Sequence, residues 1–316
     1  MTLNIKYFTN ENIIQNYLVG LIFTIICVNG LKAQQDPMYS QYMFNMLALN
    51  PAYAGSKGAL SMTGLYRNQW VGIKGAPVTQ TFFAHSPAFT EKVGLGLSLI
   101  NDKIGPIRQT MLFGDYSYTI NITETTRLAL GLKAGVNFLK THFSDLDVIE
   151  TDETFQDLSI KPQPNFGFGV YYYSDKFFVG FSSPKLIKNT IDQELDYSKL
   201  TLRQHYFLSG GYVITLNDQF KLKPTALLKM TGGAPASVEM NASVLYKDRF
   251  WMGLGHRFGD SFNTILQFKA TNQLSLGYCF EYTMSKLIRY NSGTHEMMLT
   301  YDFIFKKDRI ISPRYF

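Results

Sequence analysis

Residues 127–140, RLALGLKAGVNFLK, alternate between apolar side chains and small or polar ones. A β-strand has this period of two because successive side chains point to opposite faces, whereas a helix would spread the leucines around its circumference. We therefore predict a strand with one continuous apolar face and one face that is free to be polar. The apolar face holds Leu128, Leu130, Leu132, Ala134, Val136 and Phe138, and the other holds Ala129, Gly131, Lys133, Gly135 and Asn137.

The same alternation recurs from residue 58 to the end of the chain and predicts an all-β fold. In residues 273–282 and 295–305, for example, nearly every second residue is a large apolar or aromatic one. No helical pattern interrupts the series. The segments number fourteen, an even count as in bacterial outer-membrane barrels. The predicted strands are 58–70, 77–87, 92–101, 107–120, 126–139, 164–173, 176–183, 203–216, 219–230, 236–246, 249–258, 261–270, 273–282 and 295–305.

The connections between these segments alternate between short and long. Minimal turns are predicted at 174–175, 217–218, 247–248 and 271–272, and longer links at 140–163, 184–202, 231–235 and 283–294. Outer-membrane barrels have this asymmetry, with short periplasmic turns and longer external loops. With fourteen strands, both termini fall on the periplasmic side. We therefore expect an outer-membrane protein of a Gram-negative bacterium.

Charge placement agrees with a wall that faces lipid. A closed barrel satisfies every backbone hydrogen bond where no water is available, and a Lys or Arg pointing into mid-membrane lipid costs about 2–4 kcal/mol. A soluble β-sandwich, the alternative, would need a second sheet over the apolar face. We predict a closed antiparallel transmembrane β-barrel of about fourteen strands. The charged residues that fall on its lumen-facing side are Lys133, Lys221, Lys223, Lys229, Glu239, Arg257, Lys269 and Glu281.

A different kind of sequence precedes the strands, since residues 34–56 read QQDPMYSQYMFNMLALNPAYAGS. Asp36 followed by Pro37 is a helix-start signal, whereas Asn50-Pro51 disfavours further helix and Gly55 supplies a turn. A helix over residues 36–49 would be apolar on most sides and so buried all round. Side chains cannot fill a lumen this wide, so we predict that residues 34–57, the plug segment, form a short helical plug within the barrel of residues 58–316. Taken alone, the stretch also fits an N-terminal helix packed on a soluble core.

Residues 1–33 are predicted to be a secretory signal peptide. The apolar run at 18–28, LVGLIFTIICV, is too short for a comfortable membrane helix, and Ala33 offers a small residue at the cleavage point. The long acid-containing stretch before the run is untypical and suggests a true start codon further along. Lipidation of Cys27 is disfavoured because Ile26 stands where a small residue is needed. Removing the leader leaves Cys279 as the only cysteine, which excludes an intrachain disulfide and a thiol metal site.

Sequence patterns for catalysis and for nucleic-acid binding are both missing. The five histidines lie on different segments without metal-ligand spacing, and no nucleophile elbow or phosphate loop occurs. Basic residues are scattered and not clustered with aromatic ones, as nucleic-acid binding would require. We therefore expect a protein that is not an enzyme, with no cofactor and no bound metal.

An acidic stretch within the long link 140–163 is the most distinctive predicted loop. It is either an ordinary solvated surface loop or a docking surface for a basic or calcium-bearing partner. Its carboxylates lack the regular spacing of an EF-hand. The acidic residues are Asp145, Asp147, Glu150, Asp152, Glu153 and Asp157.

Three pieces of the chain carry a family resemblance: DPMYSQYMFNMLALNPAYAGS at 36–56, YRNQW at 66–70, and HEMMLTYDFIF at 295–305 followed by SPRYF. Together they resemble the PorP/SprF family of type IX secretion outer-membrane proteins. The resemblance implies an accessory barrel that binds and anchors secreted surface proteins, such as gliding adhesins, through their C-terminal sorting domain. Its partners would be outer-membrane lipid, this cargo and other secretion components. The motif residues of the plug segment are Asp36, Pro37, Tyr39, Ser40, Gln41, Tyr42, Phe44, Asn45, Asn50, Pro51, Ala52, Tyr53, Ala54 and Gly55.

Two other functions stay open. The plug segment also resembles the N-terminal hatch of FadL-like transporters of hydrophobic molecules, which have fourteen strands as well; this is an analogy of fold. Such a transporter would need an apolar pocket beside the plug. A plain porin is the third reading, and the plug segment disfavours it.

Overall fold

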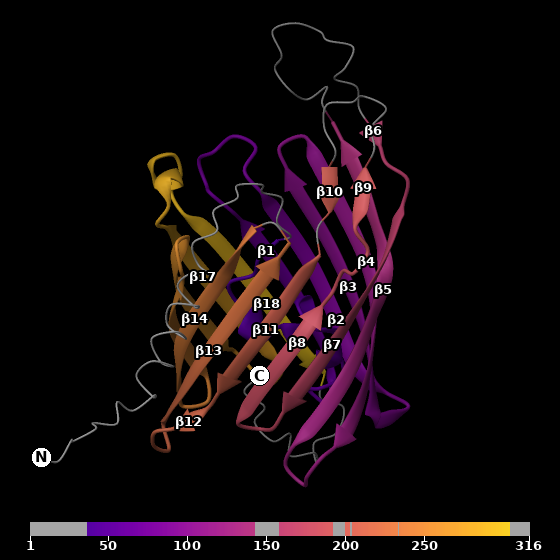
Figure 1. Cartoon of the computed structure of the whole chain (residues 1–316). Coiled ribbons are helices and arrows are strands. Elements are labelled where there is room, and N and C mark those ends of the chain that lie inside the picture. Colours follow the sequence, from indigo (N-terminus) through magenta and orange to yellow (C-terminus); the bar gives the residue numbers. More distant parts are fainter. Residues whose placement is uncertain (1–36, 143–157, 192–199, 203, 233, 304–316) are drawn as a thin grey trace, which may run out of the picture.

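The computed structural model describes residues 37–142, 158–191, 200–202, 204–232 and 234–303 (Figure 1). The predicted leader and the acidic stretch at 145–157 lie outside these ranges. Among the described residues, no helix has the length and hydropathy needed to span a membrane.

Fourteen antiparallel strands form a closed barrel. Neighbours along the chain pair with one another, and the ring closes where the first of these strands, β1, pairs with the last, β18. This arrangement gives every strand two partners, so no edge is left in the membrane. The strands are β1 (Leu60–Asn68), β2 (Val78–Ala88), β3 (Thr90–Ile104), β4 (Ile107–Asn121), β5 (Arg127–Thr141), β7 (Gln163–Tyr173), β8 (Phe177–Ser183), β11 (His205–Tyr212), β13 (Phe220–Thr231), β14 (Ala234–Tyr246), β15 (Phe250–Arg257), β16 (Ser261–Lys269), β17 (Leu274–Thr283) and β18 (Thr294–Phe303).

Four short strands accompany the barrel. β6 (Leu158–Ser159) extends the pairing of β5, and β12 (Ile214–Thr215) pairs with β13 just after β11. β9 (Asn189–Ile191) and β10 (Leu200–Leu202) pair only with each other. All fourteen predicted strands are confirmed. The predicted strand 203–216 is split at Val213 into β11 and β12, and β3 continues to Ile104, beyond its predicted end.

The two ends of the barrel differ as predicted (Figure 1). At one end, the turn end, the connections 122–126, 174–176, 216–219, 247–249 and 270–273 are short. The other end, the loop end, carries the connections 69–77, 142–162, 184–204 and 284–293, including the helical turn η5 (Lys286–Arg289). One predicted long link was wrong. β13 runs to Thr231 and β14 begins at Ala234, so only two residues connect these strands.

The outer wall is apolar and the alternation of β5 is confirmed. Leu132 is 62% exposed on the outer face, whereas its neighbours Gly131 and Lys133 are buried inside. Aromatic pairs border this wall near the turn end: the rings of Phe220 and Tyr246 are 4.9 Å apart. Interfacial aromatic residues are typical of outer-membrane barrels, where they sit at headgroup level.

We expect Leu132→Arg to destabilise the barrel by about 2–4 kcal/mol, because Leu132 is in the middle of the outward apolar column of β5. Unfolding by urea in liposomes measures the effect. The matched control is Leu216→Arg, which places the same side chain in an exposed turn at the turn end. Its cost should be about 0–1 kcal/mol. Equal costs at the two positions would contradict the membrane orientation of the wall.

Candidate functional site: the plugged lumen

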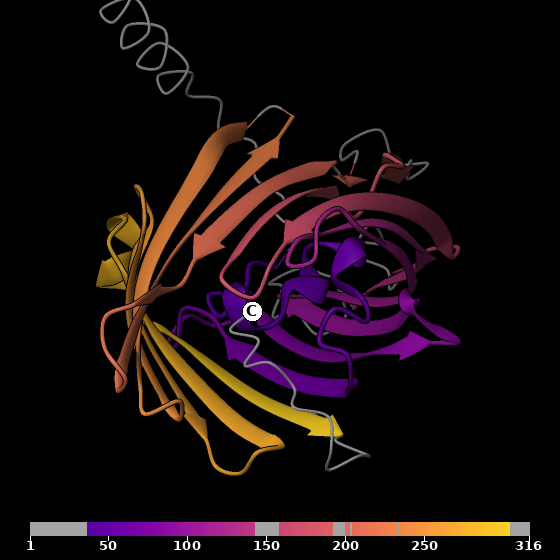
Figure 2. The ribbon, with the colours of Figure 1, turned by 90° about the horizontal axis from the view of Figure 1, so that it is seen from below.

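The plug segment lies inside the ring of strands (Figure 2). It is folded as three short 3-10 helices, η1 (Tyr42–Phe44), η2 (Met46–Ala48) and η3 (Pro51–Tyr53). The prediction of one helix over 36–49 was therefore wrong. Asn45 interrupts it with a non-helical backbone, φ −145° and ψ 79°. The broken path leads from contacts with β18 at Ser40 and Gln41 to contacts with β7 and β4 at Asn50 and Ala54. Asp36, the predicted cap, lies outside the described residues.

The sequence Asn50-Pro51, which was predicted to disfavour further helix, begins the helical turn η3. The Asn50 side chain accepts a hydrogen bond from the backbone N–H of Ala52 at 2.9 Å, and Pro51 occupies the first turn of η3. Both are start signals of a helix. The expected burial on all sides is confirmed: Tyr42, Met43, Met46 and Leu47 are at most 1% exposed.

A charge cluster holds one side of the plug segment. It consists of Arg67, Glu239, Arg257, Glu281 and Glu296, all buried and all projecting inward from the β1, β14, β15, β17 and β18 strands. Arg67 bonds Glu296 at 3.0 Å and Glu281 at 3.1 Å. Arg257 bonds Glu239 at 2.9 Å and Glu281 at 3.2 Å. Glu281 thus joins both guanidinium groups into one network.

The plug segment is bonded directly to this cluster. The backbone N–H groups of Ser40 and Gln41 donate to the two carboxylate oxygens of Glu296 at 3.0 and 2.9 Å. The Ser40 hydroxyl donates to Glu281 at 2.6 Å and accepts from Arg67 at 3.0 Å. Charge-assisted bonds of this kind are roughly twice as strong as neutral ones. The three sequence motifs at 36–56, 66–70 and 295–305 therefore meet at one point.

The opposite wall holds the end of the plug segment through neutral groups. The hydroxyl of Ser182 on β8 donates to the Leu49 carbonyl at 2.8 Å, and that of Ser117 on β4 donates to the Ala54 carbonyl at 2.7 Å. The amide of Asn50 donates to the Val170 carbonyl on β7 at 2.9 Å. These bonds satisfy backbone groups that would otherwise be buried without partners.

Glycines in the wall make room for this close approach. A Cβ at Gly94 would lie 2.1 Å from the Ala54 carbonyl oxygen, one at Gly131 would lie 2.1 Å from the Ala52 nitrogen, and one at Gly169 would lie 2.0 Å from the Asn50 side chain. Larger residues at these positions could not coexist with the plug segment in its present place. These three glycines are therefore part of the site that holds the plug segment.

The centre of the plug segment packs against a buried cation. The Lys223 ammonium lies 4.2 Å from the ring centre of Phe44 and 4.3 Å from that of Trp251. Such cation–π contacts are strongest where the cation is shielded from water. Nearby, the Tyr42 hydroxyl bonds Thr225 at 3.3 Å, and burial together with the charge of Glu239 raises the pKa of Tyr42 well above its usual range.

Most of the predicted lumen charges are confirmed as inward-facing. Lys133, Lys223, Lys229, Glu239, Arg257 and Glu281 are buried, whereas Lys221 is partly exposed and pairs with Asp248, and Lys269 is exposed at the end of β16. Sequence reasoning missed the partner of Lys133, which is Asp115 on β4 at 2.8 Å. It also did not identify Arg67 as a lumen charge, although Arg67 shares the alternation of the buried Ser61 and Thr63.

The predicted docking loop cannot be placed relative to this site. Asp145, Asp147, Glu150, Asp152, Glu153 and Asp157 lie outside the described residues. Within the described ranges, no group of three or more His, Cys, Asp or Glu side chains is arranged to hold a metal ion.

The lumen, its plug segment and the motifs that join them agree with one protein family. Residues 31–301 match the family described as type IX secretion system membrane protein PorP/SprF. The chain belongs to the PorP/SprF family. It is thus a component of type IX secretion and an outer-membrane β-barrel. The family consists of secretion-system membrane proteins and is not a known class of enzyme.

Solved structures similar to this PorP/SprF protein include a hydrocarbon channel, a FadL homologue and a porin. The CymD monoaromatic hydrocarbon channel is 12% identical with a TM-score of 0.47, and the alignment covers 86% of this chain and 95% of CymD. A FadL homologue from Pseudomonas aeruginosa is 14% identical with a TM-score of 0.45, covering 85% and 95%. The NanC porin is 10% identical with a TM-score of 0.42, covering 78% and 100%. No curated protein sequence matches the chain.

Proposed function

We propose that this PorP/SprF protein is an accessory barrel that docks secreted surface proteins at its loop end and anchors them through their C-terminal sorting domain. The observation that carries the proposal is the fixed plug segment, which is bonded to opposite walls of the lumen. A barrel sealed from within is suited to binding and not to conducting. A secretion component that does not conduct contributes through its surfaces, and the longest connections between strands are at the loop end.

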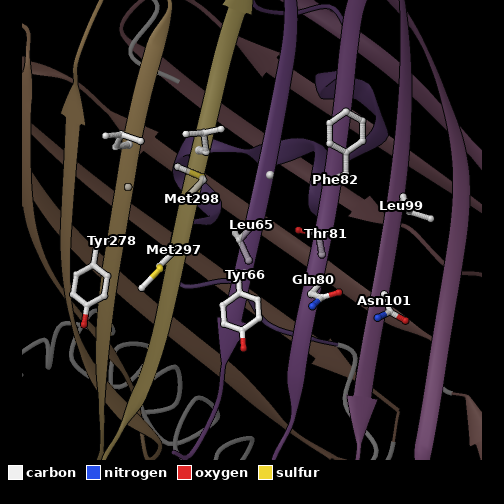
Figure 3. Close-up of a pocket in the computed structure, with 14 residues that line it drawn as sticks. Leu65, Tyr66, Gln80, Thr81, Phe82, Leu99, Asn101, Tyr278, Met297 and Met298 are labelled. Atoms are coloured by element: carbon white, nitrogen blue, oxygen red, sulfur yellow. The ribbon is translucent and has the colours of Figure 1, made fainter.

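Transport of hydrophobic molecules, the rival function, is less well supported by the lumen. The interior beside the plug segment is lined by polar and charged side chains such as Asn241, Asn263, Glu239 and Arg257. An apolar ligand would displace water from these groups without replacing their hydrogen bonds. A hollow of about 770 Å³ lined mostly by apolar groups lies on the outer wall instead, in front of β1, β2, β3, β17 and β18 (Figure 3).

The proposal requires the loop end to face the cell exterior. We expect a cysteine at Tyr290, in the connection 284–293, to react with an impermeant maleimide on intact cells. A cysteine at Asp218, in the connection 216–219, should react only after the envelope is opened. The native Cys279 is buried and should give little background. The reverse labelling pattern would invert the orientation.

We expect neutralisation of the acidic loop to release cargo into the medium while the barrel still inserts. Immunoblotting measures the adhesin retained on the cell surface and the adhesin released into the medium. The variant replaces six acidic residues by Asn or Gln: Asp145, Asp147, Glu150, Asp152, Glu153 and Asp157. The reason is that a docking surface of six carboxylates loses its attraction for a basic partner. The matched control changes Lys286 and Arg289 of the connection 284–293, also at the loop end, to Gln. Adhesin display that is normal in cells lacking the entire protein would sink the proposed function.

A further inference from the structure

Three cations form a row on the outer wall at the loop end. Lys103 on β3 is directly opposite Arg108 on β4, and Arg108 is directly opposite Lys140 on β5. All three are exposed and share the outward alternation of Leu99, Leu112 and Phe138. Opposite residues on neighbouring strands have their Cβ atoms about 5 Å apart, so the row spans roughly 10 Å.

The row marks the border of the apolar wall. On β5 the outward apolar residues end at Phe138, and the next outward position is Lys140. On β3 and β4 the apolar columns end at Leu99 and Leu112, and one polar residue, Asn101 or Thr110, separates each column from its cation. This is the depth at which lipid headgroups begin. Other strands place aromatic residues near this border, including Tyr66, Phe166 and Tyr282.

No described side chain neutralises the row. None of its three cations forms an ion pair with a carboxylate in the described parts of the chain; Asp102, the neighbour of Lys103, points inward and accepts a hydrogen bond from Thr79 at 2.6 Å. Like charges directly opposite each other on adjacent strands are destabilising. An anion bound along the row would relieve this repulsion.

Next to the row, the outer wall is hollowed (Figure 3). Gly64 lies opposite Phe82 and Leu299, and a Cβ built on it would meet nothing within 4 Å. The hollow is lined by Tyr66, Gln80, Phe82, Leu99, Asn101 and Met297 among others. Asn101 is one outward position below Lys103 on β3, so the polar edge of the hollow adjoins the row.

We infer that this surface binds the lipid A part of a lipopolysaccharide, with its phosphates on Lys103, Arg108 and Lys140 and an acyl chain in the hollow at Gly64. A row that spans two strand spacings fits a headgroup with two separate phosphates better than one with a single phosphate. The border of the apolar wall puts the headgroup beside the cations and the chains beside Leu99 and Leu112. The inference uses the orientation proposed above, in which the loop end is in the outer leaflet; the maleimide labelling tests that orientation separately.

Native mass spectrometry of the full-length protein in mild detergent tests the inference, with bis-phosphorylated lipid A as the probe. We expect the variant Lys103→Gln/Arg108→Gln/Lys140→Gln to bind it on the order of a hundredfold more weakly, since each Lys or Arg near an anionic membrane surface contributes roughly a factor of five. The control variant Lys176→Gln/Arg249→Gln/Lys269→Gln removes the same charge from the turn end, where all three side chains are exposed. It should bind lipid A as the unaltered protein does.

Three outcomes would overturn the inference. If both variants bound lipid A equally weakly, the lipid would be attracted to positive charge in general and not to the row. Equal binding of lipid A without phosphates would exclude the cation row as the headgroup site. Phosphatidylglycerol carries a single phosphate, so binding as tight as that of lipid A would show that two phosphates are not required. For the acyl chain, Gly64→Leu adds an apolar side chain to the hollow at a position where a Cβ meets nothing within 4 Å, and unchanged lipid A binding by that variant would overturn this part.

Discussion

Removing residues 37–54 is expected to turn a nearly silent barrel into an ion-conducting pore. The deleted residues include all three plug helices, and most of their side chains are buried inside the barrel. A barrel of this size is too wide for its own side chains to close. Single-channel recording in planar bilayers should show a rise of an order of magnitude or more. An intact protein that already conducts like an open pore would contradict the plug and favour a porin.

The strands should still close without the plug segment. Each wall strand keeps two hydrogen-bonded neighbours, and the outer apolar face is untouched. Water entering the lumen solvates the charge cluster, and Arg67 and Arg257 keep their pairing with Glu281. The deletion variant should therefore insert into membranes as a heat-modifiable barrel. Loss of insertion would show that the plug segment is needed for folding and not only for closure.

A matched pair of glycine substitutions gives a milder form of this test. Gly131→Ala places a methyl group 2.1 Å from the backbone nitrogen of Ala52 and should displace η3, whereas Gly114→Ala on the neighbouring strand meets nothing closer than 3.9 Å. Overpacking of this kind costs about 1–3 kcal/mol. Only Gly131→Ala should give intermittent channel openings.

The alternation of side chains was enough to predict the barrel but not the path of its plug. On β5 each residue has one of two environments, lipid or lumen, so Leu130 and Lys133 are assigned by parity alone. The plug segment has no such constraint. Its backbone follows bonds to residues far away in sequence, such as Glu296 and Ser182, and these override the helical tendency of residues 36–49.

Ion pairing in the lumen was also beyond sequence reasoning. Parity places Lys133 and Asp115 inside, but only the register of β4 against β5 makes them directly opposite. The register likewise sets Arg67 against Glu296. The acidic stretch at 145–157 stands out by its composition, yet composition carries no information on what the stretch contacts.

The second large effect is expected from Glu296→Ala, which should destabilise the plugged barrel by roughly 3–5 kcal/mol, the range for breaking a buried ion pair by removing one partner. Glu296 is fully buried and accepts bonds from Arg67, from the backbone of Ser40 and from the backbone of Gln41. Truncation leaves both N–H groups without their acceptors. Urea unfolding measures the stability, and chymotrypsin cleavage within residues 37–54 measures release of the plug segment.

Two further variants separate the charge of Glu296 from its geometry. Glu296→Gln keeps an oxygen acceptor for one of the two N–H groups and should lose less stability than Glu296→Ala. The double variant Arg67→Met/Glu296→Met removes both partners, and it should be less destabilised than the sum of its single changes because no unpaired charge remains. The control is Asp248→Ala, which breaks the ion pair between Asp248 and Lys221. The Asp248 side chain is 57% exposed. Its cost should be about 0–1 kcal/mol. If Glu296→Ala cost no more than Asp248→Ala and left residues 37–54 resistant to chymotrypsin, the charge cluster would not be what holds the plug segment in the lumen.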